Sequence, residues 1–215
     1  MSSNLRSPLL AEHYEHYLRD EDDRAFTSRV SQRYSIGTLE RLAWGGERMI
    51  RRAAVFALGL LGDFRSNAIL GRALHDEDRG VRTLAESGIR VVWCRAGSEG
   101  QRRELGMVIR MNSARRFADA IRRATRLVES APWLAEAWNQ RAIAYFRLSR
   151  YEESIADCRQ ALEENPYHFG AASGMGQCHL RLGDRTAALA CFRRALSLNP
   201  SLDGVRAQVS NLEAE

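Results

Sequence analysis

Apolar residues recur three and four positions apart along most of the chain, the spacing that gives a helix one buried face. In the segment that begins at Arg116, these apolar positions are Phe117, Ala120, Ile121, Ala124 and Leu127. The polar positions between them include Arg122, Arg123 and Arg126. No segment alternates apolar and polar residues over the length of a strand. The pattern predicts an all-α protein.

Three prolines divide the second half of the chain at a constant interval, because Pro132, Pro166 and Pro200 are 34 residues apart. Small and bulky residues recur at matching positions between them. In residues 135–168 these are Trp138, Ala142 and Tyr145, then Tyr151, Ser154, Cys158 and Ala161, closed by Asn165-Pro166. In residues 169–202 they are Gly176 and His179, then Ala188, Phe192 and Ala195, closed by Asn199-Pro200. The pattern resembles the tetratricopeptide repeat (TPR), a hairpin of two helices.

A weaker copy of this repeat occupies residues 101–134, where Pro132 is the clearest match. Residues 203–215 are expected to form a C-terminal capping helix, because Val205, Val209 and Leu212 share one stripe of an otherwise polar segment. Small residues are expected where two helices approach closely. They are Ala120, Ala142, Ala161, Gly176, Ala188 and Ala195.

The first half of the chain repeats with a different period. Ser35-Ile36 aligns with Ser66-Asn67, and Ile50-Arg51 aligns with Val81-Arg82, both at an offset of 31. Residues 54–82 resemble short bacterial HEAT repeats, which are related to those of phycobilisome lyases. The resemblance implies an N-terminal helix or cap over residues 1–23 and HEAT-like repeats over residues 24–96. Because the connection 95–100 is too short for a flexible tether, we expect one right-handed α-α superhelix that continues into the TPR array.

Composition excludes several enzyme classes. All 32 basic residues are arginine, so the lysine that a Walker loop, a protein kinase or a Schiff-base enzyme requires is missing. No G-x-S-x-G or H-E-x-x-H motif occurs. The arginine usage is typical of a GC-rich bacterial genome. We therefore predict a protein that is not an enzyme and has no cofactor.

The four cysteines form no C-x-x-C pair, so neither a zinc site nor a disulfide framework is expected, and a cytoplasmic location is predicted. Residues 1–11 lack the apolar core of a signal peptide, and the longest apolar stretch, residues 53–62, is about half the ~20 residues of a membrane helix. His13 and His16 lie one helical turn apart, but without a third ligand they predict no metal site.

The TPR resemblance implies that the first helix of each repeat lines a concave groove, which accepts an extended peptide or a helix of a partner protein. Asn and Gln side chains there can bond a peptide backbone, Ile143 and Phe146 provide an apolar anchor, and Arg147 with Arg181 can hold a carboxylate of an acidic partner. The predicted partner-binding residues are Glu136, Asn139, Gln140, Ile143, Phe146, Arg147, Ser173, Gln177, Leu180 and Arg181. The predicted function is that of an adaptor or scaffold.

Relatives that bind chaperone C-terminal tails hold the terminal carboxylate with lysine, asparagine and arginine side chains. The corresponding positions of this chain are Leu105, Ile109, Gln140, Gly170 and Gly174, none of which is a cation. The sequence therefore disfavours chaperone-tail binding.

Two alternative functions remain open. Residues 101–134 contain eight arginines against three acidic residues, and an arginine-rich face over residues 102–126 can neutralise the phosphates of a nucleic acid. An exposed helix face is the simpler interpretation, since no aromatic residues interleave to stack bases. The second alternative is a lyase-like chaperone for a prosthetic group, which requires a reactive thiol. Cys94 is the only cysteine in the HEAT-like half.

Overall fold

The computed structural model describes residues 9–214, which form thirteen α-helices, one short 3-10 turn and no strand. The all-α prediction is therefore confirmed. The part of the predicted N-terminal cap before Leu9, and most of the segment considered for a signal peptide, lie outside the described residues. The helices are α1 (Leu9–Asp20), α2 (Asp23–Ser31), α3 (Ile36–Gly45), α4 (Arg48–Leu61), α5 (Asn67–Ala73), α6 (Arg79–Arg95), α7 (Glu99–Ser113), α8 (Phe117–Ser130), α9 (Ala135–Arg147), α10 (Tyr151–Glu164), α11 (Phe169–Arg181), α12 (Arg185–Leu198) and α13 (Asp203–Ala214), with the turn η1 (Phe64–Ser66).

The chain divides into two compact units at the Val92–Trp93 bond. In the first unit, α1, α2 and α4 meet in an aromatic cluster in which the ring centroids of Tyr17 and Phe56 are 4.3 Å apart and those of Phe26 and Phe56 are 5.0 Å apart. Asp22 begins α2, because its side chain accepts hydrogen bonds from two free amides of the first turn. Among residues 9–214, none of the helices combines the length and the apolar character that crossing a membrane requires.

The 31-residue period of the first unit is visible in its interactions. Arg51 Nη1 donates to the carbonyl oxygen of Gly46 at 3.2 Å, and Arg82 Nη1 donates to the carbonyl oxygen of Glu77 at 3.0 Å. Both the donor and the acceptor of the second bond lie 31 residues after those of the first. Asp78 caps α6 by accepting from the Val81 amide at 3.0 Å. The acidic turn therefore caps the following helix.

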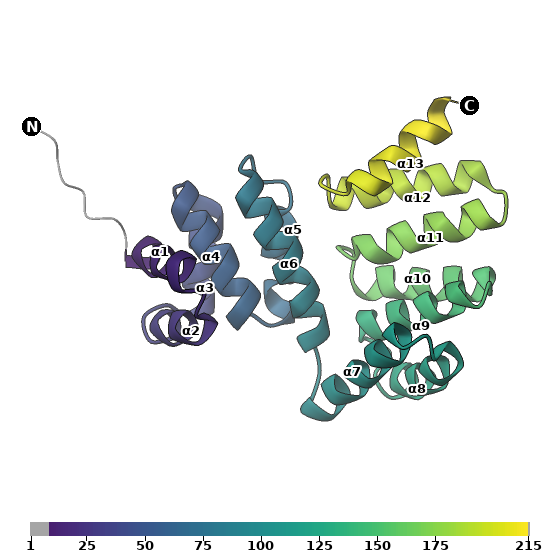
Figure 1. Cartoon of the computed structure of the whole chain (residues 1–215), viewed down its shortest axis with the longest axis horizontal. Helices are drawn as coiled ribbons and strands as arrows, with labels where there is room; N and C mark the ends of the chain where they lie inside the picture. Colours follow the sequence, from purple (N-terminus) through teal and green to yellow (C-terminus); the bar gives the residue numbers. More distant parts are fainter. Residues whose placement is uncertain (1–8, 215) are drawn as a thin grey trace, which may run out of the picture. The chain divides into compact units, whose positions relative to one another are not determined.

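The second unit consists of successive antiparallel hairpins, α7/α8, α9/α10 and α11/α12, followed by α13 (Figure 1). The turn inside each hairpin contains one residue in the left-handed region, at a spacing of 34. These residues are Arg115 (φ 58°), Ser149 (φ 59°) and Gly183 (φ 81°). The amide of the next residue donates to the carbonyl five positions earlier in all three turns, from Arg116, Arg150 and Asp184. Residues 101–134 therefore share the turn geometry of the two clearer repeats.

The core of the second unit lies between the helices of the hairpins, where the small residues are found. The five alanines singled out by the sequence are at most 1% exposed, and Phe192, which fills the adjacent space, is fully buried. At Gly176, a Cβ atom would lie 2.6 Å from the Phe192 ring. The helices α11 and α12 can approach this closely only because position 176 has no side chain.

Candidate functional site

The ten predicted partner-binding residues lie on α9 and α11, which are neighbours in the structure. The residues near the beginning of α9 differ from those near its end. Glu136 and Asn139 are buried, and Gln140 is half-buried. Ile143 is 39% exposed, and Arg147 is also exposed. The predicted set therefore consists of an internal group and an exposed group.

The internal group is a hydrogen-bonded network around the carboxylate of Glu136. Asn139 Nδ2 donates to Glu136 Oε1 at 3.2 Å, and Gln140 Nε2 donates to the same oxygen at 2.7 Å. The other carboxylate oxygen, Oε2, lies 2.9 Å from Nε2 of His168. Because His168 Nδ1 accepts a hydrogen bond from the Ala171 amide at 3.1 Å, the neutral ring carries its proton on Nε2 and donates to Glu136.

These donors decide the ionisation state of Glu136. Burial opposes the charged form, but the hydrogen bond and electrostatic attraction of His168, together with the hydrogen bonds from Gln140 and Asn139, outweigh it and hold the pKa of Glu136 below its ordinary value. Trp93 covers the other side of this network, since its ring stacks on His168 with centroids 4.2 Å apart and planes inclined by 19°. The buried carboxylate is thus enclosed by side chains of its own chain.

The network also reaches the first hairpin of the second unit, α7/α8. Asn112 Nδ2 on α7 donates to both the backbone oxygen and Oε1 of Gln140, at 2.9 Å each. The sequence offered no functional signal for Asn112, Trp93 or His168. The sequence nevertheless contained a signal for the contact between Glu136 and His168. The two residues are 32 positions apart, at the starts of the first helices of consecutive repeats, and such helices are neighbours in the fold.

The remaining predicted residues form what we call the α9–α11 surface. It comprises Ile143, Phe146, Arg147, Ser173, Gln177, Leu180 and Arg181. Phe146 and Leu180 are partly buried and pack against the hydrophobic core beneath. Arg147 and Arg181 are both exposed, and within residues 9–214 neither has a carboxylate at ion-pair distance. The guanidinium of Arg147 lies 5.5 Å from the centre of the Phe117 ring. This surface combines apolar side chains with two cations that remain available to a ligand.

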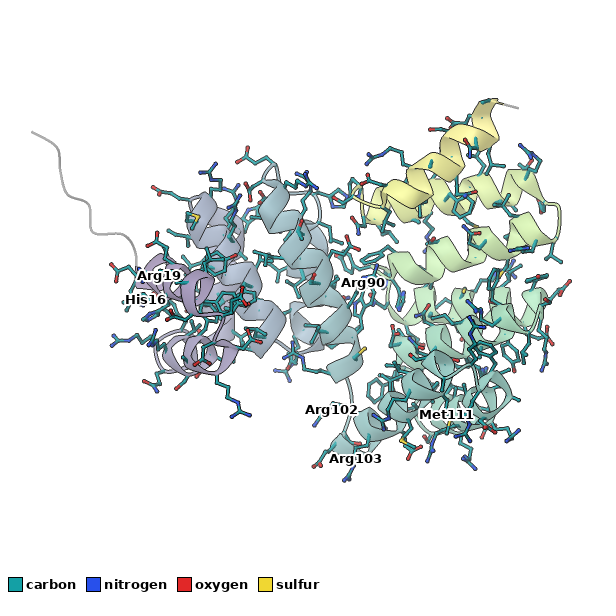
Figure 2. All side chains as sticks on the ribbon, in the orientation of Figure 1. His16, Arg19, Arg90, Arg102, Arg103 and Met111 are labelled. Carbon is teal, nitrogen blue, oxygen red and sulfur yellow. The ribbon has the colours of Figure 1, made fainter. Side chains whose placement is uncertain are left out.

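The arginine-rich segment 102–126 has much of its charge engaged internally. Arg116 and Arg122 share the carboxylate of Asp119, and Arg123 Nε lies 2.7 Å from Glu104 Oε2. Arg102 and Arg103 project from the start of α7 (Figure 2), where Arg102 donates to the carbonyl of Gly97 at 2.7 Å. These contacts favour a structural role for a large part of the predicted basic face.

The structure weakens the hypothesis of a lyase-like chaperone. Burial, with a further contribution from the negative charge of Glu136, raises the pKa of the Cys94 thiol to about 12. Since the thiolate is the nucleophile, a thiol of this pKa is a poor acceptor for a prosthetic group. His13 and His16 have no third partner, because the described part of the chain contains no group of three potential metal-ligating side chains.

Comparison with known families identifies the two clearer repeats. The model described as "Tetratricopeptide repeat" matches residues 135–168, and a second model with the same description matches residues 170–202. The Hsp70-Hsp90 organizing protein of Triticum aestivum is 30% identical over 99 residues, which are 46% of this chain and 17% of that protein. A TPR repeat-containing protein of Rhizobium etli is 35% identical over 81 residues, 38% of this chain and 40% of the relative. The chain thus matches less than half the length of either relative.

Solved structures agree with the fold of the second half of the chain. The first TPR of Spaghetti (RPAP3), bound to the HSP90 peptide SRMEEVD, has a TM-score of 0.53 at 21% identity and covers 55% of this chain and 94% of that one. The Arabidopsis OM64 TPR domain has a TM-score of 0.52 at 20% identity and covers 54% of this chain and 96% of that one. These likenesses establish a TPR-like helical fold.

Proposed function

Because residues 135–202 carry two tetratricopeptide repeats, we propose that this protein is an adaptor that binds a segment of a partner protein on the α9–α11 surface. The observation that carries the proposal is the combination of an exposed apolar side chain, Ile143, with two exposed cations that have no carboxylate partner among residues 9–214, Arg147 and Arg181. Repeat proteins commonly bind their partners on the surface lined by equivalent helices. No catalytic family is indicated.

Each part of the surface has a distinct role in this proposal. Ile143, together with the accessible parts of Phe146 and Leu180, buries an apolar side chain of the ligand. Arg147 and Arg181 bind carboxylates through their paired N–H groups, so the ligand is acidic. Ser173 and Gln177, which are half-buried on α11, bond the ligand backbone.

Glu136, Asn139 and Gln140 have a positioning role in this proposal. Their polar atoms bond one another, His168 and Asn112, which leaves few of them to a ligand. Because the network joins α7, α9 and the start of α11, it fixes the relative placement of the helices that carry the binding residues.

The nature of the relatives supports a protein partner. By their descriptions, they include an Hsp70-Hsp90 organizing protein and TPR domains with bound chaperone peptides, one of which ends in the acidic sequence EEVD. This chain departs from the tail-binding pattern, because Leu105 is fully buried and none of the five corresponding positions is a cation. We therefore infer an acidic segment held at the ends of α9 and α11.

We also infer that the first unit is HEAT-like and that the protein acts in the cytoplasm of a bacterium. The interactions of Arg51 and Arg82, 31 residues apart, support the repeat. The four cysteines are all unpaired, as expected in a reducing compartment. The similarity to a Rhizobium etli protein supports a bacterial source.

The test is site-specific photo-crosslinking combined with affinity capture from nuclease-treated extract of the native cell. A photoreactive phenylalanine analogue replaces Ile143 on the α9–α11 surface or Arg159, which is exposed on α10. We expect one protein to crosslink through position 143 and not through position 159. The Arg147→Glu/Arg181→Glu variant should lose this protein, whereas the Arg159→Glu/Arg194→Glu variant, with the same change in charge, should retain it.

Equal recovery of the partner by both double variants would refute the α9–α11 surface. A partner that is captured from untreated extract but not from nuclease-treated extract, and that an Arg115→Glu/Arg126→Glu variant fails to capture, would instead support the nucleic-acid hypothesis for residues 102–126.

A further inference from the structure

We propose that the first unit carries a second binding surface, a hollow between the C-terminal ends of α3 and α5 that binds an acidic segment of a partner protein. An apolar side chain of that segment enters the hollow, and the carboxylates beside it in the segment lie at the rim. The hollow is lined by Ala43, Trp44, Ile69, Arg72, Ala73 and Asp76, together with His75. It shares no residue with the α9–α11 surface and stands whether or not that surface binds a partner.

Trp44 is the main apolar element of this hollow. Its side chain is 61% exposed, more than any other large hydrophobic side chain in the described residues. A tryptophan ring offers a large apolar area at a low cost in conformational entropy, and tryptophan is enriched among residues that dominate binding energies. A partner that covers this ring would remove its apolar surface from water.

Arg72 provides the charge. Its guanidinium carbon lies 3.6 Å from the centre of the Trp44 ring, which is stacking distance. Arg72 is exposed and has no carboxylate partner among residues 9–214. A guanidinium stacked on an aromatic face keeps its edge N–H groups free, and these groups bind a carboxylate in a bidentate manner.

The floor of the hollow is apolar and small. Ala43, Ile69 and Ala73 contribute to a space of about 260 Å³. This volume lies below the ~300–1,000 Å³ of small-molecule sites. It suits one aromatic or branched aliphatic side chain of a protein ligand better than a metabolite.

The one carboxylate at the rim does not repel an acidic ligand. Asp76 Oδ2 accepts from Arg51 Nε at 2.8 Å, and Oδ1 accepts from Arg51 Nη2 at 2.9 Å and from the Asp78 amide at 2.8 Å. Arg51 is shared between Asp76 and the exposed Glu77. Arg82 donates to the backbone oxygens of both residues, so the two carboxylates of this turn face two guanidinium groups and the turn is fixed. The charge that the hollow offers to a partner is that of Arg72, which favours an acidic segment over a basic one.

The test uses three tripeptides as probes, acetyl-Glu-Phe-Glu-amide, acetyl-Gln-Phe-Gln-amide and acetyl-Lys-Phe-Lys-amide. Each is titrated into the full chain with ¹⁵N-labelled tryptophan while the indole signals are followed by NMR. The chain has four tryptophans, so the other three signals are internal controls, and a Trp44→Phe variant assigns the signal of Trp44. A circular dichroism spectrum verifies that each variant remains helical.

We expect a saturable shift confined to the Trp44 signal, with a dissociation constant on the order of 1 mM for so small a probe. The acidic peptide should bind about three- to fivefold more tightly than the neutral one, as for an exposed charge pair, and the basic peptide should bind more weakly than both. Arg72→Gln should abolish the preference for the acidic peptide. Arg79→Gln, which removes an exposed arginine outside the hollow, should preserve it.

Three results would overturn the proposal. One is a Trp44 signal that none of the peptides shifts. Another is an equal response to all three peptides. The third is a Trp44 shift that depends on protein concentration without peptide, because the occupant would then be a second copy of this chain. None of these results depends on the α9–α11 surface, so this proposal and the proposed function can fail separately.

Discussion

His168 Nε2 lies 2.9 Å from Glu136 Oε2, and both side chains are almost completely buried. Through this contact the start of α11 is bonded to the start of α9 across one full repeat. Removing the carboxylate by Glu136→Ala would leave three donors without their acceptor, on the buried Asn139 and His168 and on the half-buried Gln140. We expect a loss of about 3 kcal/mol in the free energy of unfolding, measured by urea denaturation. The control, Glu164→Gln on the exposed end of α10, should change it by less than about 0.5 kcal/mol.

The same pair predicts how stability depends on pH. Because the pKa of Glu136 is lower in the folded protein than its ordinary value of 4.5, the unfolded chain binds the proton first as the pH falls. The contribution of Glu136 is therefore complete above about pH 5 and is lost as the pH falls through 4.5 toward the folded pKa. The difference in urea midpoint between the wild type and Glu136→Gln should narrow between pH 5 and pH 3. A constant difference over that range would contradict the assignment of an ionised carboxylate.

The sequence predicted the repeats because they depend on packing, and packing residues recur. Ala142 and Gly176 are equivalent positions of consecutive repeats, and both are buried as expected. The internal network could not be read in the same way. The sequence placed Glu136 and Asn139 among the groove-lining residues, whereas the structure buries both, with Glu136 bonded to His168 and His168 covered by Trp93.

Both Arg115 and Gly183 have a positive φ, so introducing a glycine at the first position should stabilise the protein and removing the glycine at the second should destabilise it. Arg115 adopts a φ of 58°, which costs a non-glycine residue about 1–2 kcal/mol, partly offset by the greater flexibility that glycine gives to the unfolded chain. Arg115→Gly should therefore stabilise the protein by about 0.5–1 kcal/mol. Gly183→Ala should destabilise it by about 1 kcal/mol. The cost is conformational, because no atom lies within 4 Å of the added Cβ.

Thermal and urea denaturation of the two variants, with Ser149→Gly as a third member of the series, provide the measurement. If Arg115→Gly were destabilising, the turn of the first repeat would not have the geometry of the other two.

Two ion pairs with the same N–O distance should differ strongly in how much the free energy of unfolding falls when each pair is broken. Arg141 and Asp157 are nearly buried and form a bidentate pair, with Nε–Oδ2 at 2.7 Å and Nη2–Oδ1 at 2.8 Å. Burial raises the pKa of Asp157 even though Arg141 opposes this shift. Asp157→Ala leaves a buried guanidinium unpaired, so we expect a loss of about 3–5 kcal/mol in the free energy of unfolding. Glu213→Ala breaks the exposed pair with Arg193, also 2.7 Å, and should cost at most about 1 kcal/mol.

A double variant separates the pair itself from the cost of leaving one charge behind. Arg141→Met/Asp157→Leu should recover most of the stability lost in Asp157→Ala, because no charge then remains buried. A double variant no more stable than Asp157→Ala would contradict this explanation, because the loss would then not arise from the unpaired charge.

The two proposed binding surfaces could be predicted from the sequence to different degrees. Arg147 and Arg181 recur at the same position of consecutive repeats, so the sequence could identify them before their exposure was known. Trp44 and Arg72 are 28 residues apart and belong to no shared motif, and only the packing of α3 beside α5 brings them together. A site formed by helix ends leaves no periodic signal in the sequence.

Two glycines of α11 predict opposite responses to the same substitution. A Cβ at Gly176 would lie 2.6 Å from the ring of Phe192, which is fully buried and cannot move aside freely. Gly176→Ala should therefore cost about 1–3 kcal/mol through overpacking, despite the better helix propensity of alanine. At Gly174 the nearest atom is Cys158 Sγ at 3.5 Å, an ordinary contact, so Gly174→Ala should stabilise the protein by about 0.5–1 kcal/mol. Urea midpoints of the two variants measure both effects. The double variant Gly176→Ala/Phe192→Leu tests the cause, because a smaller partner should relieve part of the cost; an unchanged cost would place the conflict elsewhere than at the α11–α12 contact.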